Sequence, residues 1–153
     1  MHNQTARAEN NMKRFALAFC FLLLNITANA QQSTSPTADS AAVRTTVTNY
    51  IEAYYTGDAR RMEQTLHPHY LKHMIHGEIP VREKTGSEMV REVRTHGPAD
   101  LPQSNKTEEV TVLDIAGSIA SAKLVTPGWV DYMTLEKVGR DWKILSVVQR
   151  IND

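Results

Sequence analysis

The chain lacks several features that would point to a defined class of protein. It has a single cysteine, Cys20, so no disulfide can form within one copy. Its 17 basic and 17 acidic residues cancel, and no stripe of lysine and arginine marks a nucleic-acid-binding surface. No apolar run reaches the roughly 20 residues that a membrane-spanning helix needs. We therefore expect no disulfide scaffold, no nucleic-acid partner and no permanent membrane span.

Signatures of catalysis are also missing. The sequence has no HExxH zinc motif, no glycine-rich phosphate loop and no dinucleotide fingerprint. No Ser-His-Asp or Cys-His arrangement can be recognised either. The sequence therefore predicts no cofactor, and any reaction would depend on ordinary acid and base side chains.

The first 30 residues have the pattern of an export signal. A basic pair at residues 13–14 precedes the apolar run Phe15–Leu24, FALAFCFLLL. Ala28 and Ala30 then give the small-x-small pattern of a cleavage site. We therefore expect export to the periplasm or out of the cell, with cleavage after Ala30.

Two further boundaries follow from this pattern. Met12 lies directly before the basic pair, so translation starting there rather than at Met1 is a hypothesis that stays open. Residues 31–38, QQSTSPTA, are polar and contain proline, which predicts a flexible leader. One domain is expected over residues 39–153. Of the whole chain, 41% of the residues are hydrophobic, which is typical of a protein with a globular core.

The first part of this domain carries the patterns of three helices. Apolar residues recur at helical spacing from Asp39 or Ser40 to Thr56, with Asp39 as the expected N-cap. A second, short helix is expected over Ala59–Leu66, capped by Asp58. The segment after it, residues 69–75, is expected to be a short strand or an irregular crossing, and residues 77–84 a loop or short hairpin.

The third helix is expected to begin near Thr85, because Thr85 and Glu88 have the spacing of a capping box. Downstream of Lys106 the pattern changes to strands punctuated by glycine at hairpin spacing. Four strands are expected, at Thr107–Ile115, Ser118–Thr126, Trp129–Val138 and Trp142–Ile151. The predicted fold class is α+β, with three N-terminal helices packed on an antiparallel sheet of four long strands plus short additions.

Apolar residues fall on both faces of two of these strands. Strict alternation places Trp142, Ile144 and Val148 on one face of the last strand and Leu145, Val147 and Ile151 on the other. In Thr107–Ile115, Val110 and Val112 likewise oppose Leu113 and Ile115. Helices can cover only one face, so we expect a homodimer through the other. The alternative is that loops of the same chain cover it.

Three segments carry a resemblance to a known group of proteins. They are Val47–Asp58, which contains YIEAYYTGD, Leu66–Tyr70, LHPHY, and Val130–Leu145, VDYMTLEKVGRDWKIL. On these segments the chain resembles the NTF2-like superfamily, whose cone-shaped fold is shared by nuclear transport factor 2, ketosteroid isomerase, scytalone dehydratase and SnoaL-type cyclases. Within it, the chain is similar to the exported bacterial group labelled putative lumazine-binding. The resemblance implies a curved sheet around the first helix and a conical pocket open at one end.

Asp131 is the first candidate for chemistry. On its predicted strand it shares a face with Trp129, Met133 and Leu135. A carboxylate on an apolar face is costly unless it is paired or its raised pKa serves a purpose. The resemblance to ketosteroid isomerase-like proteins implies a pocket carboxylate that transfers a proton, and Asp131 would be that catalytic group. The alternative is an ordinary surface hydrogen bond near the exposed end of the strand.

Four histidines are clustered in the sequence, at positions His67, His69, His73 and His76. Zinc needs three or four ligands that converge tetrahedrally, and Pro68 prevents one regular element from holding all four. We therefore expect no metal site, while metal binding by this cluster stays open. His73 alone is a second catalytic candidate, because histidine titrates near neutral pH.

Aromatic residues are the candidates for ligand binding, namely Tyr54, Tyr70, Trp129 and Tyr132. Aromatic walls suit flat ligands such as pteridines, flavins or polyketides, although core packing is the commoner role of such residues. The leading interpretation is an exported domain that binds a small apolar or aromatic ligand. The alternatives are a cofactor-free isomerase, dehydratase or cyclase that uses Asp131, and a protein-interaction module that uses its exposed sheet face.

Overall fold

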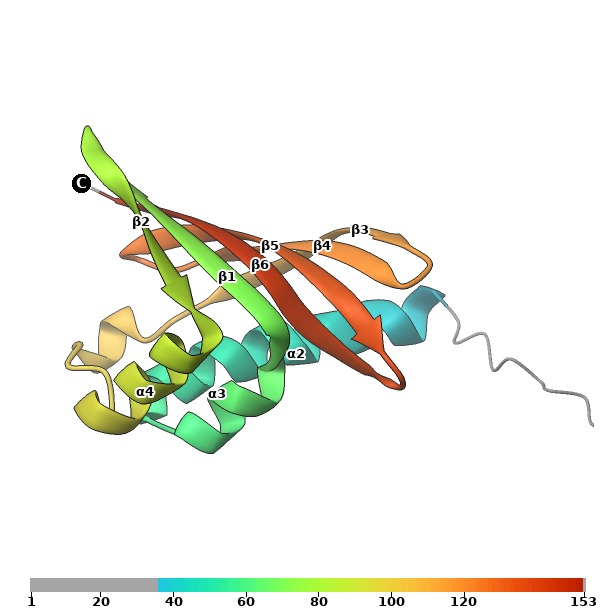
Figure 1. The fold of residues 1–153 in the computed structure, drawn as a ribbon, viewed down its shortest axis with the longest axis horizontal. Helices are drawn as coiled ribbons and strands as arrows, with labels where there is room; N and C mark the ends of the chain where they lie inside the picture. Colours follow the sequence, from blue (N-terminus) through green and yellow to red (C-terminus); the bar gives the residue numbers. More distant parts are fainter. Residues whose placement is uncertain (1–35, 153) are drawn as a thin grey trace, which may run out of the picture. The chain divides into compact units, whose positions relative to one another are not determined.

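The computed structural model describes residues 36–152, so the predicted signal peptide lies outside the described residues. Figure 1 shows three helices on one side of a curved sheet. The helices are α2 (Pro36–Thr56), α3 (Ala59–Thr65) and α4 (Gly86–His96), with a short 3₁₀ turn η1 (Gln103–Asn105). The strands are β1 (Leu66–His76), β2 (Ile79–Thr85), β3 (Glu109–Ala116), β4 (Ile119–Val125), β5 (Trp129–Val138) and β6 (Asp141–Ile151). No helix over residues 36–152 is long and apolar enough to cross a membrane.

The helices follow their sequence patterns closely. Asp58 accepts a hydrogen bond from the backbone N–H of Arg61 at 2.9 Å, and the capping box between Thr85 and Glu88 is complete. Two expectations are wrong. Residues 36–38 belong to α2 rather than to a leader, and Asp39 is therefore inside the helix, where its carboxylate accepts from Lys137 and Trp142.

The backbone segments that follow α2 and α4 meet at Gly57, directly after α2. Its φ of +74° lies in the left-handed region, which favours glycine. A Cβ atom at this position would lie 2.4 Å from the carbonyl carbon of Gly97, at the end of α4. The end of α2 is therefore packed directly against the backbone that follows α4, and only glycine fits there.

The sheet has six strands in the order β2-β1-β6-β5-β4-β3. The expectation of four long strands plus short additions is wrong, because β1 has 11 residues and pairs in parallel with β6. β1 and β2 also separate α3 from α4, so the helices are not one N-terminal group. Polar residues interrupt β1, so its sequence alone does not indicate a long strand. The alternation of its side chains nevertheless places Tyr70 and Lys72 in the core.

Two β-bulges correct the prediction that both faces of the strands are apolar. Leu145 is an extra residue in β6, because Thr134 pairs with Ser146 and Leu135 with Ile144. The bulge shifts the alternation by one, so Ile144 and Val147 are both fully buried whereas Val148 is 43% exposed. Leu113 is the corresponding extra residue in β3, between Val112 and Asp114, and is 51% exposed. Each strand thus has one apolar face and one mixed face.

The mixed face is the convex side of the sheet, away from the helices. Strand pairing places residues of this face side by side from Thr111 of β3 to Glu83 of β2, and five of them follow one another in the order Lys123, Tyr132, Val148, His73 and Glu83. Apolar groups are present but charged residues lie at both ends of the row. We call these five residues the outer row.

Candidate functional site

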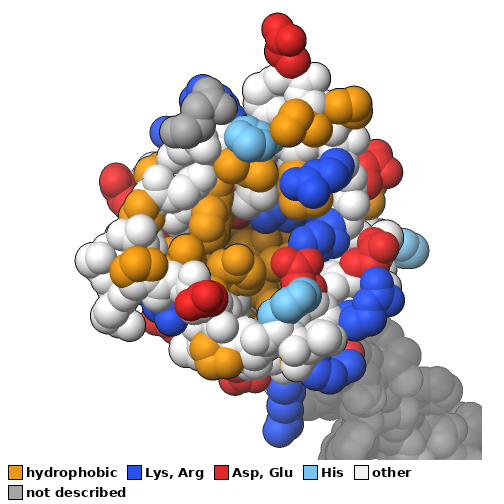
Figure 2. Space-filling model, turned by 90° about the vertical axis from the view of Figure 1, so that its left-hand side faces the viewer, with side chains coloured by type: hydrophobic (Ala, Val, Ile, Leu, Met, Phe, Trp, Pro, Cys, Tyr) orange, Lys and Arg blue, Asp and Glu red, His pale blue; other side chains and the backbone are white. Residues whose placement is uncertain are grey.

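A cavity of about 410 Å³ opens between the helices and the concave face of the sheet. Figure 2 shows a hollow with hydrophobic side chains inside it and charged side chains around it. Residues from α2, β1, β2, α4, β5 and β6 line the cavity: Tyr50, Ile51, Tyr54, Lys72, Met74, Arg82, Lys84, Met89, Glu92, Trp129, Gln149 and Ile151.

A second, more open groove of about 620 Å³ lies between α2, α3 and the hairpin of β5 and β6. Two of its charged side chains are already engaged, since Arg61 contacts Glu52 and Asn49, and Lys143 donates to the carbonyl of Gln64. The 410 Å³ cavity is the better candidate, because ionisable groups are buried beside it.

Asp131 and Lys72 form the buried charged pair of the site. Lys72 Nζ lies 3.5 Å from Asp131 Oδ1, and the two side chains are 6% and 0% exposed. Asp131 is directly opposite Gln149 in the neighbouring strand, and both Lys72 and Gln149 reach the cavity wall. The alternative that Asp131 makes a surface hydrogen bond is therefore wrong, and the carboxylate lies just behind the wall.

Burial acts against the charge on both members of this pair. It raises the pKa of Asp131, while the positive charge of Lys72 opposes the increase. It lowers the pKa of Lys72, while the negative charge of Asp131 opposes the decrease. A proton can therefore move within this pair at lower cost than between the same groups in water.

Two tyrosine hydroxyls extend the pair. Lys72 Nζ donates to Tyr50 Oη at 3.2 Å, and Tyr50 Oη lies 3.3 Å from Tyr70 Oη. Burial is the main reason why the pKa of each tyrosine is raised, so both hydroxyls stay protonated. Asp131, Lys72, Tyr50 and Tyr70 thus form one buried polar network.

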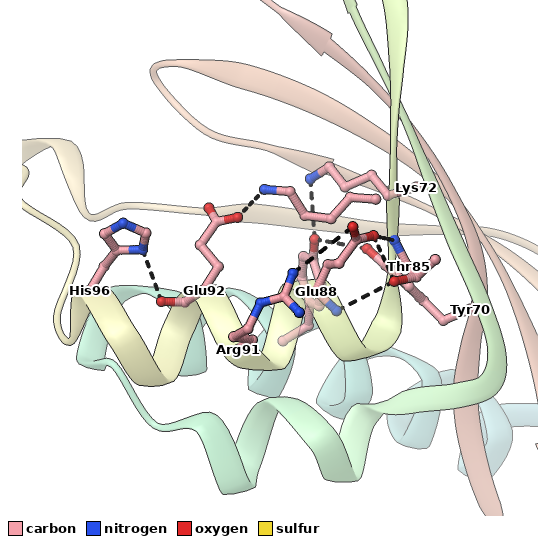
Figure 3. Close-up of polar contacts among 9 residues, drawn as sticks. Tyr70, Lys72, Thr85, Glu88, Arg91, Glu92 and His96 are labelled. Carbon is pink, nitrogen blue, oxygen red and sulfur yellow. Dashed lines mark hydrogen bonds and ion pairs between the residues drawn. The ribbon is translucent and has the colours of Figure 1, made fainter.

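The rim of the cavity carries a second ion pair, between Lys84 of β2 and Glu92 of α4. Figure 3 shows Glu92 extending from α4 toward the strands, on the same side as Lys72. Arg82, two residues before Lys84, also reaches the rim. Charged groups therefore lie both beside the cavity and at its opening.

Tyr54 and Trp129 form an aromatic wall. Their ring centroids are 5.7 Å apart and the planes meet at 88°, an edge-to-face contact. The structure thus brings together four of the six residues predicted from the sequence, with Tyr54 and Trp129 on the wall and Tyr70 and Asp131 behind it.

The other two predicted residues face away from the cavity. His73 follows Lys72 in β1, so it lies on the convex face, where its Nε2 is 3.1 Å from a carboxylate oxygen of Glu83. Tyr132 follows Asp131 in β5 and is 52% exposed, with Lys123 Nζ above its ring. Neither side chain belongs to the site.

The histidine cluster does not converge. The four residues are distributed along β1, in which each residue advances the chain by about 3.3 Å. His67 approaches Glu136, whereas His73 approaches Glu83. Within residues 36–152, no group of three His, Cys, Asp or Glu side chains is placed to hold a metal ion.

Sequence reasoning missed Lys72, Tyr50 as a hydroxyl donor and acceptor, and Glu92. Lys72 stands between two histidine-containing stretches, which suggested a solvated segment. The signal that could have found it is the alternation of Tyr70, Lys72 and Met74, because two large apolar residues flank the lysine on one strand face.

Comparison with solved structures shows the fold. A crystal structure of an NTF2-like protein of unknown function from Silicibacter pomeroyi has a TM-score of 0.65 at 18% identity, covering 78% of this chain and 100% of that one. A similar protein from Shewanella baltica has a TM-score of 0.64 at 16% identity, covering 78% and 98%. A putative dehydratase of the NTF2-like family from Streptomyces avermitilis has a TM-score of 0.51 at 17% identity, covering 78% and 99%.

No curated protein sequence matches the chain. At these low identities the solved structures are similar in fold alone. The family is shown by a separate match, which spans residues 38–149 and so nearly all of the described part. The chain therefore has the NTF2-like fold and belongs to the family described as putative lumazine-binding.

Proposed function

We propose that the protein binds a small, flat aromatic ligand in the cavity between the helices and the concave sheet face. The observation that carries this proposal is the combination of an open volume of about 410 Å³ with the aromatic wall of Tyr54 and Trp129. A volume of this order accommodates a bicyclic or tricyclic compound. A protein-interaction module without a pocket would have filled this space with its own side chains.

Binding is tested with lumazine, the compound named in the family description. Isothermal titration of the protein lacking residues 1–30 is expected to give saturable binding, and a Tyr54→Ala variant should bind more weakly. Native mass spectrometry of protein purified from its own host should also detect a bound small molecule. If lumazine, a flavin and a naphthalene compound all fail to bind, the proposal is wrong.

A second candidate function is catalysis at the same site, in which Asp131 transfers a proton to or from a bound ligand. The contact of 3.5 Å between Asp131 and Lys72 favours it, because burial brings the proton affinities of the two groups closer together. Asp131 would act as the acid or base through Lys72, which lines the cavity in front of the carboxylate, and Tyr50 would stabilise negative charge on the ligand. An Asp131→Asn variant that binds the ligand normally but no longer catalyses exchange of a carbon-bound proton of the ligand with deuterium would support this function. Equal exchange in both proteins would contradict it.

Export and dimerisation complete the proposal. We expect the mature protein to begin at Gln31, which N-terminal sequencing of protein from its own host can test. Two copies would pack convex face to convex face with the twofold axis parallel to the strands. That arrangement places Lys123 of one copy opposite Glu83 of the other, since these residues lie at the two ends of the outer row. Light scattering at micromolar concentration should show a dimer, and Tyr132→Glu should give a monomer.

A further inference from the structure

Cations outnumber anions on the wall of the cavity. Lys72, Lys84 and Arg82 line it, whereas Glu92 is the one acidic side chain of its wall among the described residues. Asp131 lies behind the wall and is fully buried, so a ligand would meet Lys72 before it meets the carboxylate. A pocket with this balance of charge favours a ligand that brings a negative group of its own.

Lys72 has hydrogen-bonding capacity that its neighbours do not use. An ammonium group has three donors, and Tyr50 Oη accepts one of them at 3.2 Å. Asp131 Oδ1 is at 3.5 Å, which is an ion-pair distance rather than a short hydrogen bond. An anionic oxygen entering the cavity could therefore accept from Lys72, and such charge-assisted bonds are the strong ones.

The carboxylate of Glu92 already occupies a position beside Lys84 at the cavity. It forms the ion pair with Lys84, and its charge acts on the other groups around the cavity. Burial is the largest influence on the pKa values of Tyr54, Tyr70 and Lys72, and the charge of Glu92 contributes to all three. Lys84 is directly opposite Lys72 in the neighbouring strand, which places the two side chains side by side on the same face of the sheet.

We propose that the ligand carries a carboxylate or an equivalent anionic group, which binds between Lys72 and Lys84 and displaces Glu92 from Lys84. The aromatic part of the same ligand would lie against Tyr54 and Trp129. Glu92 then has a defined role, because it neutralises Lys84 while the cavity is empty and competes with the ligand for it. This inference rests on the proposed function, namely that the cavity binds a small aromatic ligand.

Matched ligands separate the two proposals. Titration calorimetry would compare pterin-6-carboxylate with its carboxamide, and 2-naphthoate with 2-naphthamide, which differ only in the charged group. We expect each acid to bind at least about tenfold more tightly than its amide. Equal affinities within each pair would contradict the inference that the ligand carries an anionic group. The proposed ligand-binding function would remain. Failure of all four compounds to bind would overturn both.

Two variants test the residues with effects of opposite sign. Lys84→Met should weaken binding of the acids about tenfold more than binding of the amides. Glu92→Gln should strengthen binding of the acids several-fold, because it removes the competing carboxylate, and damage to the fold cannot produce such a gain. Glu83→Gln, the same chemical change on the convex face, is the control and should alter neither. Weaker acid binding by Glu92→Gln, or equal changes for acid and amide, would overturn the inference.

Discussion

Two acid–base pairs occupy neighbouring positions on opposite faces of the same sheet. On the concave side, Lys72 and Asp131 lie 3.5 Å apart, with side chains 6% and 0% exposed. On the convex side, His73 and Glu83 lie 3.1 Å apart, with side chains 36% and 62% exposed. The outer pair is closer, yet we expect the inner pair to have the larger effect on folding, because it is buried. Surroundings, rather than distance, decide what each pair does.

The two pairs differ in their exposure to water. Water solvates and screens the charges of the outer pair, so holding them together contributes little. The inner pair has lost its water, and burial therefore moves the pKa of Asp131 up and that of Lys72 down. Each inner group therefore depends on the other for a counter-charge.

The largest effect is expected from breaking the inner pair. Asp131→Asn should lower the free energy of unfolding by about 3–5 kcal/mol, because it leaves the Lys72 ammonium buried without a counter-charge. Urea denaturation followed by circular dichroism measures this loss. The matched control is Glu83→Gln in the outer pair, which should change stability by at most about 0.5 kcal/mol. Equal losses in the two variants would show that the faces do not differ in this way.

Removing both inner charges should reverse the loss. The double variant Lys72→Met/Asp131→Leu should recover the roughly 3 kcal/mol lost in Asp131→Asn, since apolar residues fill the site without buried charge. A double variant no more stable than Asp131→Asn would mean that the pair is a net source of stability.

The pH dependence of this double variant sharpens the comparison. Asp131, with its raised pKa, favours folding most below the ordinary carboxyl pKa, and this contribution is lost as pH rises through its folded pKa. Lys72, with its lowered pKa, favours folding most above the ordinary lysine pKa, and this is lost as pH falls through its folded pKa. Relative to the double variant, the wild-type protein should therefore be least stable near neutral pH and gain at both extremes. Denaturation midpoints across the pH range would test this, and a constant difference would contradict it.

Ligand binding should separate the faces as well. Trp129→Ala removes half of the aromatic wall and is expected to weaken lumazine binding about tenfold. Tyr132→Ala removes an aromatic ring from the same strand, but from the convex face, and should leave the affinity unchanged. Calorimetric titration of both variants decides the matter, and comparable losses would place the ligand elsewhere.

The comparison also explains what the sequence could and could not predict. Capping residues such as Asp58 and Thr85 act over one helical turn, so local spacing identified them correctly. The bulges at Leu113 and Leu145 depend on pairing with the partner strand, so no local sequence pattern predicts them. Strict alternation therefore assigned Val147 and Val148 to the wrong faces.

The sequence identified one member of the buried charged pair in the candidate site but not the other. Asp131 was recognised because apolar residues flank it on its own strand. Its partner Lys72 was not, since the two belong to strands that are separated by β6 and are far apart in sequence. His73 and Tyr132 were chosen by residue type, and alternation along a strand places such neighbours of a buried residue on the opposite face.

The smallest effect is expected from His73, and it tests the comparison from the outer side. His73→Ala removes one member of an exposed pair, so it should cost at most about 1 kcal/mol of unfolding free energy. Because the side chain points away from the cavity, the affinity for lumazine should equal that of the wild-type protein. Titration of the variant measures this directly, with Tyr54→Ala as the positive control. A loss of binding in His73→Ala without a loss of stability would place the ligand on the convex face, and would remove the cavity as the site of function.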